Sequence, residues 1–169
     1  GFSVGMASIV LVALATTAVV GGLYWGRRTD SHGPKASLNR VLALWSIALL
    51  IGSFSLFFTG ELVAGFTAGQ VLFIIAGVIL GFGFGGLAGA DRILMYRLSP
   101  PKQLGEFYGL YGLVGKGSQV LGGLLYGATI FLLHEPLGNL AYTVGLLTLL
   151  ATMLVGWYLL KGVPEQRKG

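Results

Sequence analysis

Five long blocks of apolar residues alternate with short polar segments along this chain. The blocks cover about residues 2–25, 38–58, 71–96, 106–133 and 140–160. A helix of about 20 residues, rising about 1.5 Å per residue, crosses a hydrocarbon core of about 30 Å. A helix also satisfies its own backbone hydrogen bonds in lipid, and the blocks lack the alternation of a barrel strand. The pattern predicts an all-α membrane protein with five transmembrane helices, forming a single membrane domain over residues 1–169.

Composition supports a membrane protein and narrows the chemistry. Hydrophobic residues make up 54% of the chain and charged residues 10%, whereas a soluble domain is about a quarter charged. Cysteine is absent, which excludes a thiolate metal site, and His32 and His134 fall in separate predicted loops. We therefore expect no metal and no cofactor. The net charge is +5, but the basic residues lie between the apolar blocks, so they indicate membrane topology rather than a nucleic-acid partner.

Lysine and arginine occupy alternate polar segments, as an odd number of spans requires. The first loop, the third loop and the C-terminus carry Arg27, Arg28, Lys35 and Arg40, then Arg92, Arg97 and Lys102, then Lys161, Arg167 and Lys168. Because positive charge is retained in the cytoplasm, these three segments are predicted to be cytoplasmic, with Gly1 on the far side. An aromatic belt is predicted near the same ends, formed by Tyr24, Trp25, Trp45, Tyr96, Tyr108, Trp157 and Tyr158.

Glycine follows a helical pattern in two of the blocks. The third block contains Gly77, Gly81, Gly85 and Gly89, and the fourth contains Gly105, Gly109, Gly112, Gly123 and Gly127. Residues four apart share one face of a helix, and small side chains there let another helix approach closely inside lipid. These glycines are predicted to mediate helix packing. Static packing and a seam that slides during a transport cycle both fit the pattern.

Lys116 is the charged residue that most needs an explanation. It follows Glu106 by ten residues, so it lies about 15 Å along the predicted helix. A lysine at that depth is costly unless it faces water or a partner, which makes it a candidate for anion binding or a proton-coupled step. Ser118 and Gln119 follow closely and are candidates for substrate contact. The alternative is a structural lysine whose long side chain reaches the membrane edge.

Four more charges are expected at the cytoplasmic level. Asp30 lies in the first loop, Asp91 and Arg92 lie near the end of the third block, and Glu106 opens the fourth. Opposite charges there can pair across helices and hold that end closed, and we favour a pair between Arg92 and Asp30. The alternative is that all four are solvated and contribute little.

Two segments resemble the major facilitator superfamily. The motif Gly26-x-x-x-Asp30-x-x-Gly33-Pro34-Lys35 is similar to its short loop motif, which recurs between the eighth and ninth helices. The segment from Gly105 to Lys116 resembles the vacuole-effluxer-like branch. The resemblance implies a partial C-terminal six-helix half of a twelve-helix transporter, with Asp30 and Arg92 in a cytoplasmic gate network near Glu106. Ser31 replaces the usual basic residue of the motif, and Asp91 replaces a small polar residue.

The function that this resemblance implies is secondary active transport of a small solute by alternating access, with amino acids as a candidate substrate class. The expected partners are the lipid bilayer, a small-molecule substrate, a coupling proton and the missing N-terminal half of the same transporter. The expected location is a bacterial inner (plasma) membrane. The chain is interpreted as a fragment of the longer transporter.

Two other functional classes make different demands on the sequence. A membrane-embedded protease needs a serine near a histidine, or paired aspartates, at membrane depth. Ser118 has no such histidine and Asp91 has no matching aspartate, so we do not expect an enzyme. A non-transporting scaffold or assembly factor with the same fold remains the alternative, because a fold does not fix a function. Replacing Lys116 with leucine distinguishes the two: a scaffold tolerates it and a transporter loses activity.

Overall fold

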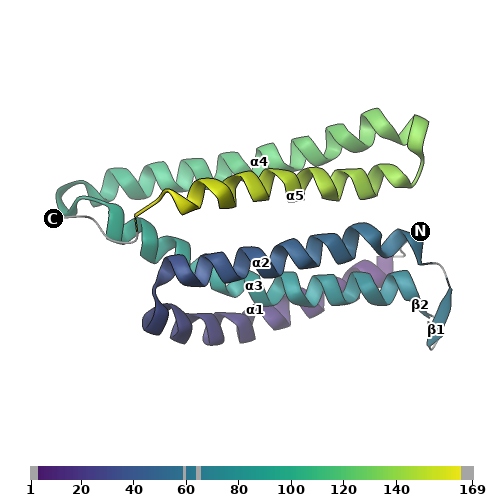
Figure 1. Cartoon of the computed structure of the whole chain (residues 1–169), viewed down its shortest axis with the longest axis horizontal. Helices are drawn as coiled ribbons and strands as arrows, with labels where there is room; N and C mark the ends of the chain where they lie inside the picture. The colour runs from purple at the N-terminus through teal and green to yellow at the C-terminus, as the bar shows by residue number, and fades with distance from the viewer. Residues whose placement is uncertain (1–3, 59, 64–65, 165–169) are drawn as a thin grey trace.

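Five long helices form an elongated bundle in the computed structural model, which describes residues 4–58, 60–63 and 66–164 (Figure 1). They are α1 (Val4–His32), α2 (Pro34–Phe54), α3 (Ala68–Leu98), α4 (Leu104–Leu137) and α5 (Leu140–Lys161). Each contains a stretch long and apolar enough to cross a membrane. The predicted all-α membrane fold with five spanning helices is therefore confirmed.

Short elements connect the long helices at two places. Between α2 and α3 lie the 3-10 turn η1 (Ser55–Phe57) and the antiparallel strands β1 (Glu61–Val63) and β2 (Phe66–Thr67), with Glu61 opposite Thr67. The sequence predicts only a loop there. Thr67 then begins α3 with a capping box, because its hydroxyl accepts from the Gln70 N–H (3.2 Å) and its N–H donates to Gln70 Oε1 (3.0 Å). A second 3-10 turn, η2 (Pro101–Gln103), precedes α4.

The first predicted loop is almost entirely helical. α1 continues past Gly26 to His32, and α2 begins at Pro34, so a single residue, Gly33, makes the turn. Gly33 has φ 85°, a conformation that glycine adopts without a steric cost. Pro34 suits the first helical position, where its missing N–H is not needed. Polar residues end a membrane span without ending a helix, so the loop prediction was wrong for Gly26–His32.

α4 also continues further than predicted. The fourth block was predicted to end at about residue 133, with His134 in a loop, but the helix runs to Leu137 and includes Pro136. A proline in the last turn removes one hydrogen bond and is tolerated more easily than one in mid-helix. The helix ends instead at Gly138, which has φ 55° and donates its N–H to the His134 carbonyl oxygen (2.8 Å).

The glycine stripe of α3 packs directly against α1. A Cβ added to Gly81 would overlap the Leu14 carbonyl oxygen, and one added to Gly85 would overlap the Ala18 carbonyl oxygen. A Cβ on Gly77 would lie 2.9 Å from Val10 Cγ1. Three of the four predicted packing positions thus lie against α1, two of them against its backbone. The fourth, Gly89, has nothing within 4 Å of its Cβ position.

Two of the tryptophans expected in the aromatic belt pack inside the bundle instead. Trp25 is 3% exposed and lies against Gly86 of α3. Trp45 lies against Gly83, and its Nε1–H donates to the Leu80 carbonyl oxygen (3.0 Å). Both rings occupy space that a glycine leaves free on the opposite helix. For Trp25 the belt prediction was wrong, because glycines in α3 create room for a buried ring.

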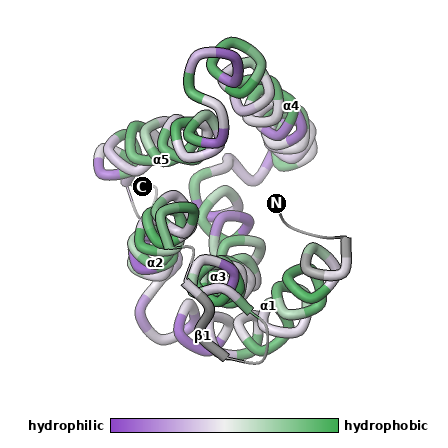
Figure 2. Tube along the Cα trace, turned by 90° about the vertical axis from the view of Figure 1, so that its right-hand side faces the viewer, coloured by the Kyte–Doolittle hydropathy of each residue, from purple (hydrophilic) through white to green (hydrophobic). Residues whose placement is uncertain are grey.

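α5 is fixed to α2 by hydrogen bonds along its length. Near the α2 N-terminus, the Lys35 ammonium donates to the carbonyl oxygens of Lys161 (2.9 Å) and Val163 (2.5 Å). Trp157 Nε1–H donates to Asn39 Oδ1 (2.8 Å), and Thr143 Oγ1 donates to the Ser53 carbonyl oxygen (2.9 Å). Seen end-on, α5 lies beside α2, and α4 lies beside α5 at the opposite side of the bundle from α1 (Figure 2).

Candidate functional site

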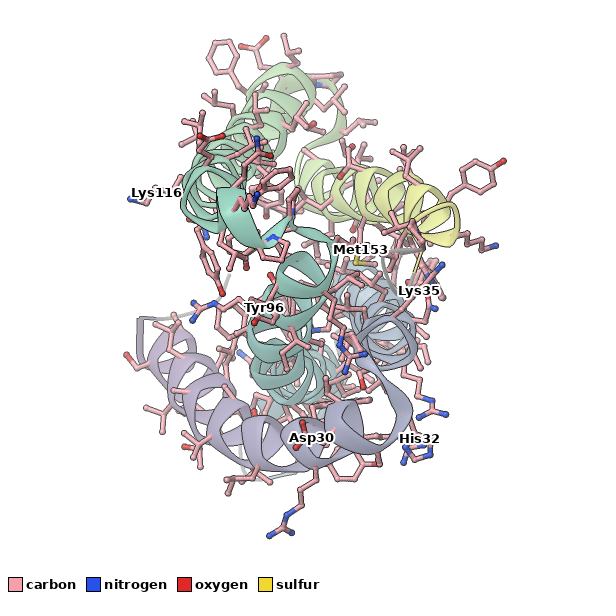
Figure 3. All side chains as sticks on the ribbon, turned by 90° about the vertical axis from the view of Figure 1, so that its left-hand side faces the viewer. Asp30, His32, Lys35, Tyr96, Lys116 and Met153 are labelled. Carbon is pink, nitrogen blue, oxygen red and sulfur yellow. The ribbon has the colours of Figure 1, made fainter. Side chains whose placement is uncertain are left out.

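Lys116 lies deep along α4 and points away from the other helices. It follows the first residue of the helix, Leu104, by 12 positions (116 − 104), which is about 18 Å along the axis. Its side chain is exposed and projects outward from the bundle (Figure 3). Within the described ranges, no hydrogen bond or ion pair reaches its ammonium group. Ser118 and Gln119 are also exposed, and Ser118 Oγ donates to the Gly115 carbonyl oxygen of its own helix (2.8 Å).

Lys116 and Gln119 lie within the glycine pattern of α4. Steps of three or four residues place one set of positions on the same side of a helix. We name this set the α4 stripe; its members are Gly105, Gly109, Gly112, Lys116, Gln119, Gly123 and Gly127. A Cβ added to any of these five glycines meets nothing within 4 Å. The packing predicted for Gly109 and Gly112 therefore has no counterpart in the part of the chain that the structure describes.

Asp91 makes a hydrogen bond to α4 rather than an ion pair with α1. Its Oδ2 accepts from the Tyr111 hydroxyl (2.5 Å), and its Oδ1 accepts from the Arg92 N–H (2.7 Å). Arg92 itself is exposed. This side of α3 is thus directed towards α4.

The expected pair between Arg92 and Asp30 is not formed in this structure. Asp30 is exposed on α1, and no ion pair joins it to Arg92 among the residues described. Glu106 is exposed at the start of α4. The four predicted gate charges therefore share one end of the bundle but are not joined in a network here.

Tyr111 was missed by the sequence analysis, although a signal for it exists. The chain reverses direction around Pro101, between α3 and α4. Residues equally far from the reversal face each other in an antiparallel pair, and Asp91 and Tyr111 each lie ten positions from Pro101. A tyrosine on one helix is long enough to donate its hydroxyl to a carboxylate on the facing helix, and the structure shows this hydrogen bond.

An open pocket of about 390 Å³ lies beside this hydrogen bond, where the ends of α2, α3, α4 and α5 meet. Its walls include Leu38, Asp91, Ser99, Phe107, Tyr111 and Leu160. The lining surface is almost entirely apolar, and Asp91, Ser99 and Tyr111 are its polar residues. In the described part of the chain, no three candidate metal ligands are grouped together.

Basic and aromatic side chains pair at the same end of the bundle. The Arg28 guanidinium lies 6.0 Å from the Tyr24 ring centroid, and Lys161 Nζ lies 5.9 Å from that of Tyr158. Both tyrosines are exposed. Such pairs are typical of a membrane–water boundary, where an aromatic ring meets lipid and a cation meets headgroups. They agree with a boundary at this end, while the side of the membrane stays a prediction.

Known proteins resemble this chain in both sequence and fold. The model of the Major Facilitator Superfamily matches residues 1–169. Autophagy-related protein 22 of Chaetomium globosum is 31% identical over 131 residues, covering 76% of this chain and 20% of that protein. The inward-open structure of the xylose transporter XylE from E. coli matches with a TM-score of 0.77 at 16% identity, covering 95% of this chain and 38% of that one.

Each match covers only part of the known protein. This chain spans about a fifth of the curated relative and under two-fifths of the solved transporter. At 16% identity the structural match shows the fold alone. The family match extends over the chain from Gly1 to Gly169, and five spanning helices make it a multi-pass membrane protein. This chain belongs to the Major Facilitator Superfamily.

Proposed function

We propose that this chain forms most of one half of a secondary transporter, which moves a small solute across a membrane by alternating access. The observation that carries the proposal is the α4 stripe. It lies on a helix apolar enough to span a membrane, yet none of the described residues of that helix is buried by the rest of the chain. A spanning helix with an uncovered polar face is incomplete by itself.

The cost of burying charge supports this interpretation. Lys116 is exposed about 18 Å along α4, and a lysine facing hydrocarbon at that depth costs at least a few kcal/mol. The face that carries it must therefore meet water or another protein segment. In our proposal it lines the solute path. The Lys116 ammonium then binds an anionic group of the solute, such as a carboxylate, or takes part in a proton-coupled step, and Gln119 adds hydrogen bonds.

The proposed partner is the N-terminal half of the same transporter, and we assign this chain to the C-terminal half. The support is that the chain covers only part of the relatives it matches and that the α4 stripe has no neighbour within it. In the assembled transporter the path runs between the two halves, so the stripe faces it.

The finer assignments rest on the resemblance of the segment from Gly105 to Lys116. They are membership of the vacuole-effluxer-like branch, amino acids as the substrate class and a location in a bacterial inner membrane. The basic ends of the helices then face the cytoplasm. None of the groups in the pocket near Asp91 forms a catalytic arrangement, so we propose transport without an enzymatic step.

The test compares transport by the complete protein and two lysine variants. The wild type, Lys116→Leu and Lys102→Leu are expressed in a transport-deficient host, and uptake or efflux of labelled amino acids is measured at matched membrane abundance. Lys102 is the control because it is exposed in the short turn η2, outside the long helices. We expect Lys116→Leu to lose transport and Lys102→Leu to keep it.

Two other results would change the proposal. Transport by Lys116→Leu at the wild-type rate would remove Lys116 from the solute path and leave it a structural lysine. If the complete protein moves none of the labelled amino acids, the proposed substrate class fails. If it also moves no other solute on a wider panel, the scaffold function replaces transport.

A further inference from the structure

α4 is attached to the rest of the chain in two different ways. In its C-terminal half it packs on α5: the Tyr126 ring lies against Gly145, and His134 meets Tyr142 edge-on, with ring centroids 6.0 Å apart. Its contact with α3 is confined to the end near Pro101. Of the hydrogen bonds between described residues, one joins α4 to a different long helix, and it is the bond from the Tyr111 hydroxyl to Asp91.

That hydrogen bond is well placed to control the separation of α3 and α4. The acceptor is a carboxylate, so the bond is charge-assisted and stronger than one between neutral groups. The other carboxylate oxygen accepts from the backbone N–H of Arg92 (2.7 Å), which fixes the orientation of Asp91 towards α4. Both residues are half-buried, so water competes only partly for the bond.

The surroundings leave α4 free to move at this end. The pocket of about 390 Å³ adjoins the bond and is lined by Leu38, Phe107 and Leu160, which give few polar contacts to break. α5 is fixed to α2 through Lys35 (2.9 Å to the Lys161 carbonyl oxygen). At the opposite end of α4, Gly138 has φ 55° and forms the turn into α5. Movement of α4 about that turn would change the pocket without displacing α5.

We propose that the hydrogen bond between Asp91 and Tyr111 is a latch, which holds this end of α4 against α3 and opens during the transport cycle to widen the pocket. This inference rests on the proposed transport function for its place in a cycle. The latch itself is a property of the two helices. Tyr111 is a positioning residue, and no contact with the solute is required of it.

The test uses a cysteine reporter inside the pocket. The chain has no cysteine of its own, and Ser99 is 5% exposed and lines the pocket. Ser99→Cys is introduced into the complete protein, with any cysteines elsewhere replaced, and its reaction rate with a hydrophilic maleimide is measured in detergent micelles. Opening of the latch exposes the thiol, so the rate reports the fraction of open molecules.

Two latch variants and one control are compared in that background. Tyr111→Phe removes the hydroxyl and keeps the ring, and we expect it to raise the labelling rate by about tenfold, the effect of losing a hydrogen bond to a charged group. Asp91→Asn keeps an acceptor without the charge, so a smaller increase is expected. Tyr108→Phe is the control, since Tyr108 is exposed on the same helix and its rate should not change.

The proposal is overturned if Tyr111→Phe and Asp91→Asn both label at the rate of the control. If Tyr111→Phe does not fold, as judged by size-exclusion chromatography, Asp91→Asn decides alone. Labelling needs no substrate, so it tests the latch even if the protein transports nothing. Where transport is found, Asp91→Cys and Tyr111→Cys joined by a bifunctional thiol reagent should abolish it. Full transport by the joined protein would overturn the requirement that the latch opens.

Discussion

The glycine stripes of α3 and α4 have similar spacing and opposite surroundings. In α3, Gly81 and Gly85 touch the backbone of α1 so closely that a single added carbon would overlap it. In α4, Gly109 and Gly123 have nothing within 4 Å of their Cβ positions. The first stripe is a closed seam between two helices of this chain. The second is an open face, and it is the one that carries Lys116 and Gln119.

The contrast shows that glycines at helical spacing in a membrane helix do not always mediate packing against another helix of the same chain. Lipid provides no hydrophobic force between helices, so glycines support close packing only where a second helix is present to use it. α1 and α2 meet α3 with buried residues such as Trp25 and Leu38, whereas the described residues of α4 include no buried one. Lys116 and Gln119 lie on the helix that the rest of the chain leaves uncovered. The uncovered helix is therefore also the one that carries these polar side chains, which supports the proposed solute path.

The largest effect is expected within the closed seam. Gly85→Ala should lower the free energy of unfolding by about 3 kcal/mol, because the new Cβ overlaps the Ala18 carbonyl oxygen and the helices must move apart. Gly89→Ala is the matched control four residues on, with nothing within 4 Å of its Cβ position. Thermal unfolding of the complete protein in detergent, followed by size-exclusion chromatography, compares the two. Equal losses for both variants would mean that α1 and α3 are not packed as described.

A smaller loss is expected where α5 is fixed to α2. Lys35→Met removes two hydrogen bonds from the ammonium to the carbonyl oxygens of Lys161 and Val163, at a cost of about 1–2 kcal/mol for a half-buried group. Arg40→Met removes an exposed charge from the same helix and should have little effect. The same unfolding measurement applies. If Arg40→Met costs as much as Lys35→Met, the loss reflects net charge at the membrane surface rather than the fixing of α5.

The sequence predicts those features of the fold that the lipid bilayer requires. Apolar length determines where a chain crosses the membrane, so the number of spanning helices was predicted correctly. The ends of the helices were harder to predict from the sequence, because each end depends on the φ angle of a single residue. Gly33 and Gly138 end helices with positive φ values, while the polar residues before Gly33 and Pro136 before Gly138 remain helical.

The candidate site was harder to predict, because it depends on how each helix is rotated about its axis. Hydropathy identified Asp91 and Arg92 as unusual but could not show which neighbour they face. Asp91 is directed to Tyr111 of α4, and Arg92 makes no ion pair with Asp30 among the residues described. Trp25 illustrates the same limit, since its place near a helix end suggested lipid contact and its rotation buries it against Gly86. Pairing across the reversal at Pro101 is the one such contact that spacing could have revealed.

A coupling energy below that of the Lys35 contact is expected between Asn39 and Trp157. Asn39→Leu and Trp157→Phe each remove the hydrogen bond of 2.8 Å that joins α2 to α5. A double-mutant cycle with both variants should give a coupling of about 0.6–1 kcal/mol, the range found for hydrogen bonds between membrane helices. Unfolding in detergent provides the four free energies. Additive losses, with no coupling, would indicate that the two side chains stabilise their helices separately.

The smallest effect is expected on the open face, and it is the result that most sharpens the contrast between the stripes. Gly123→Ala adds a Cβ that meets no atom of this chain, and alanine favours a helix over glycine by up to about 1 kcal/mol. In the complete protein the melting temperature should therefore stay the same or rise slightly, because a water-filled path accommodates a methyl group. A loss as large as that of Gly85→Ala would show that a helix from outside this chain packs directly on the α4 stripe. The stripe would then be a second closed seam, and Lys116 would lie at a protein interface instead of on the solute path.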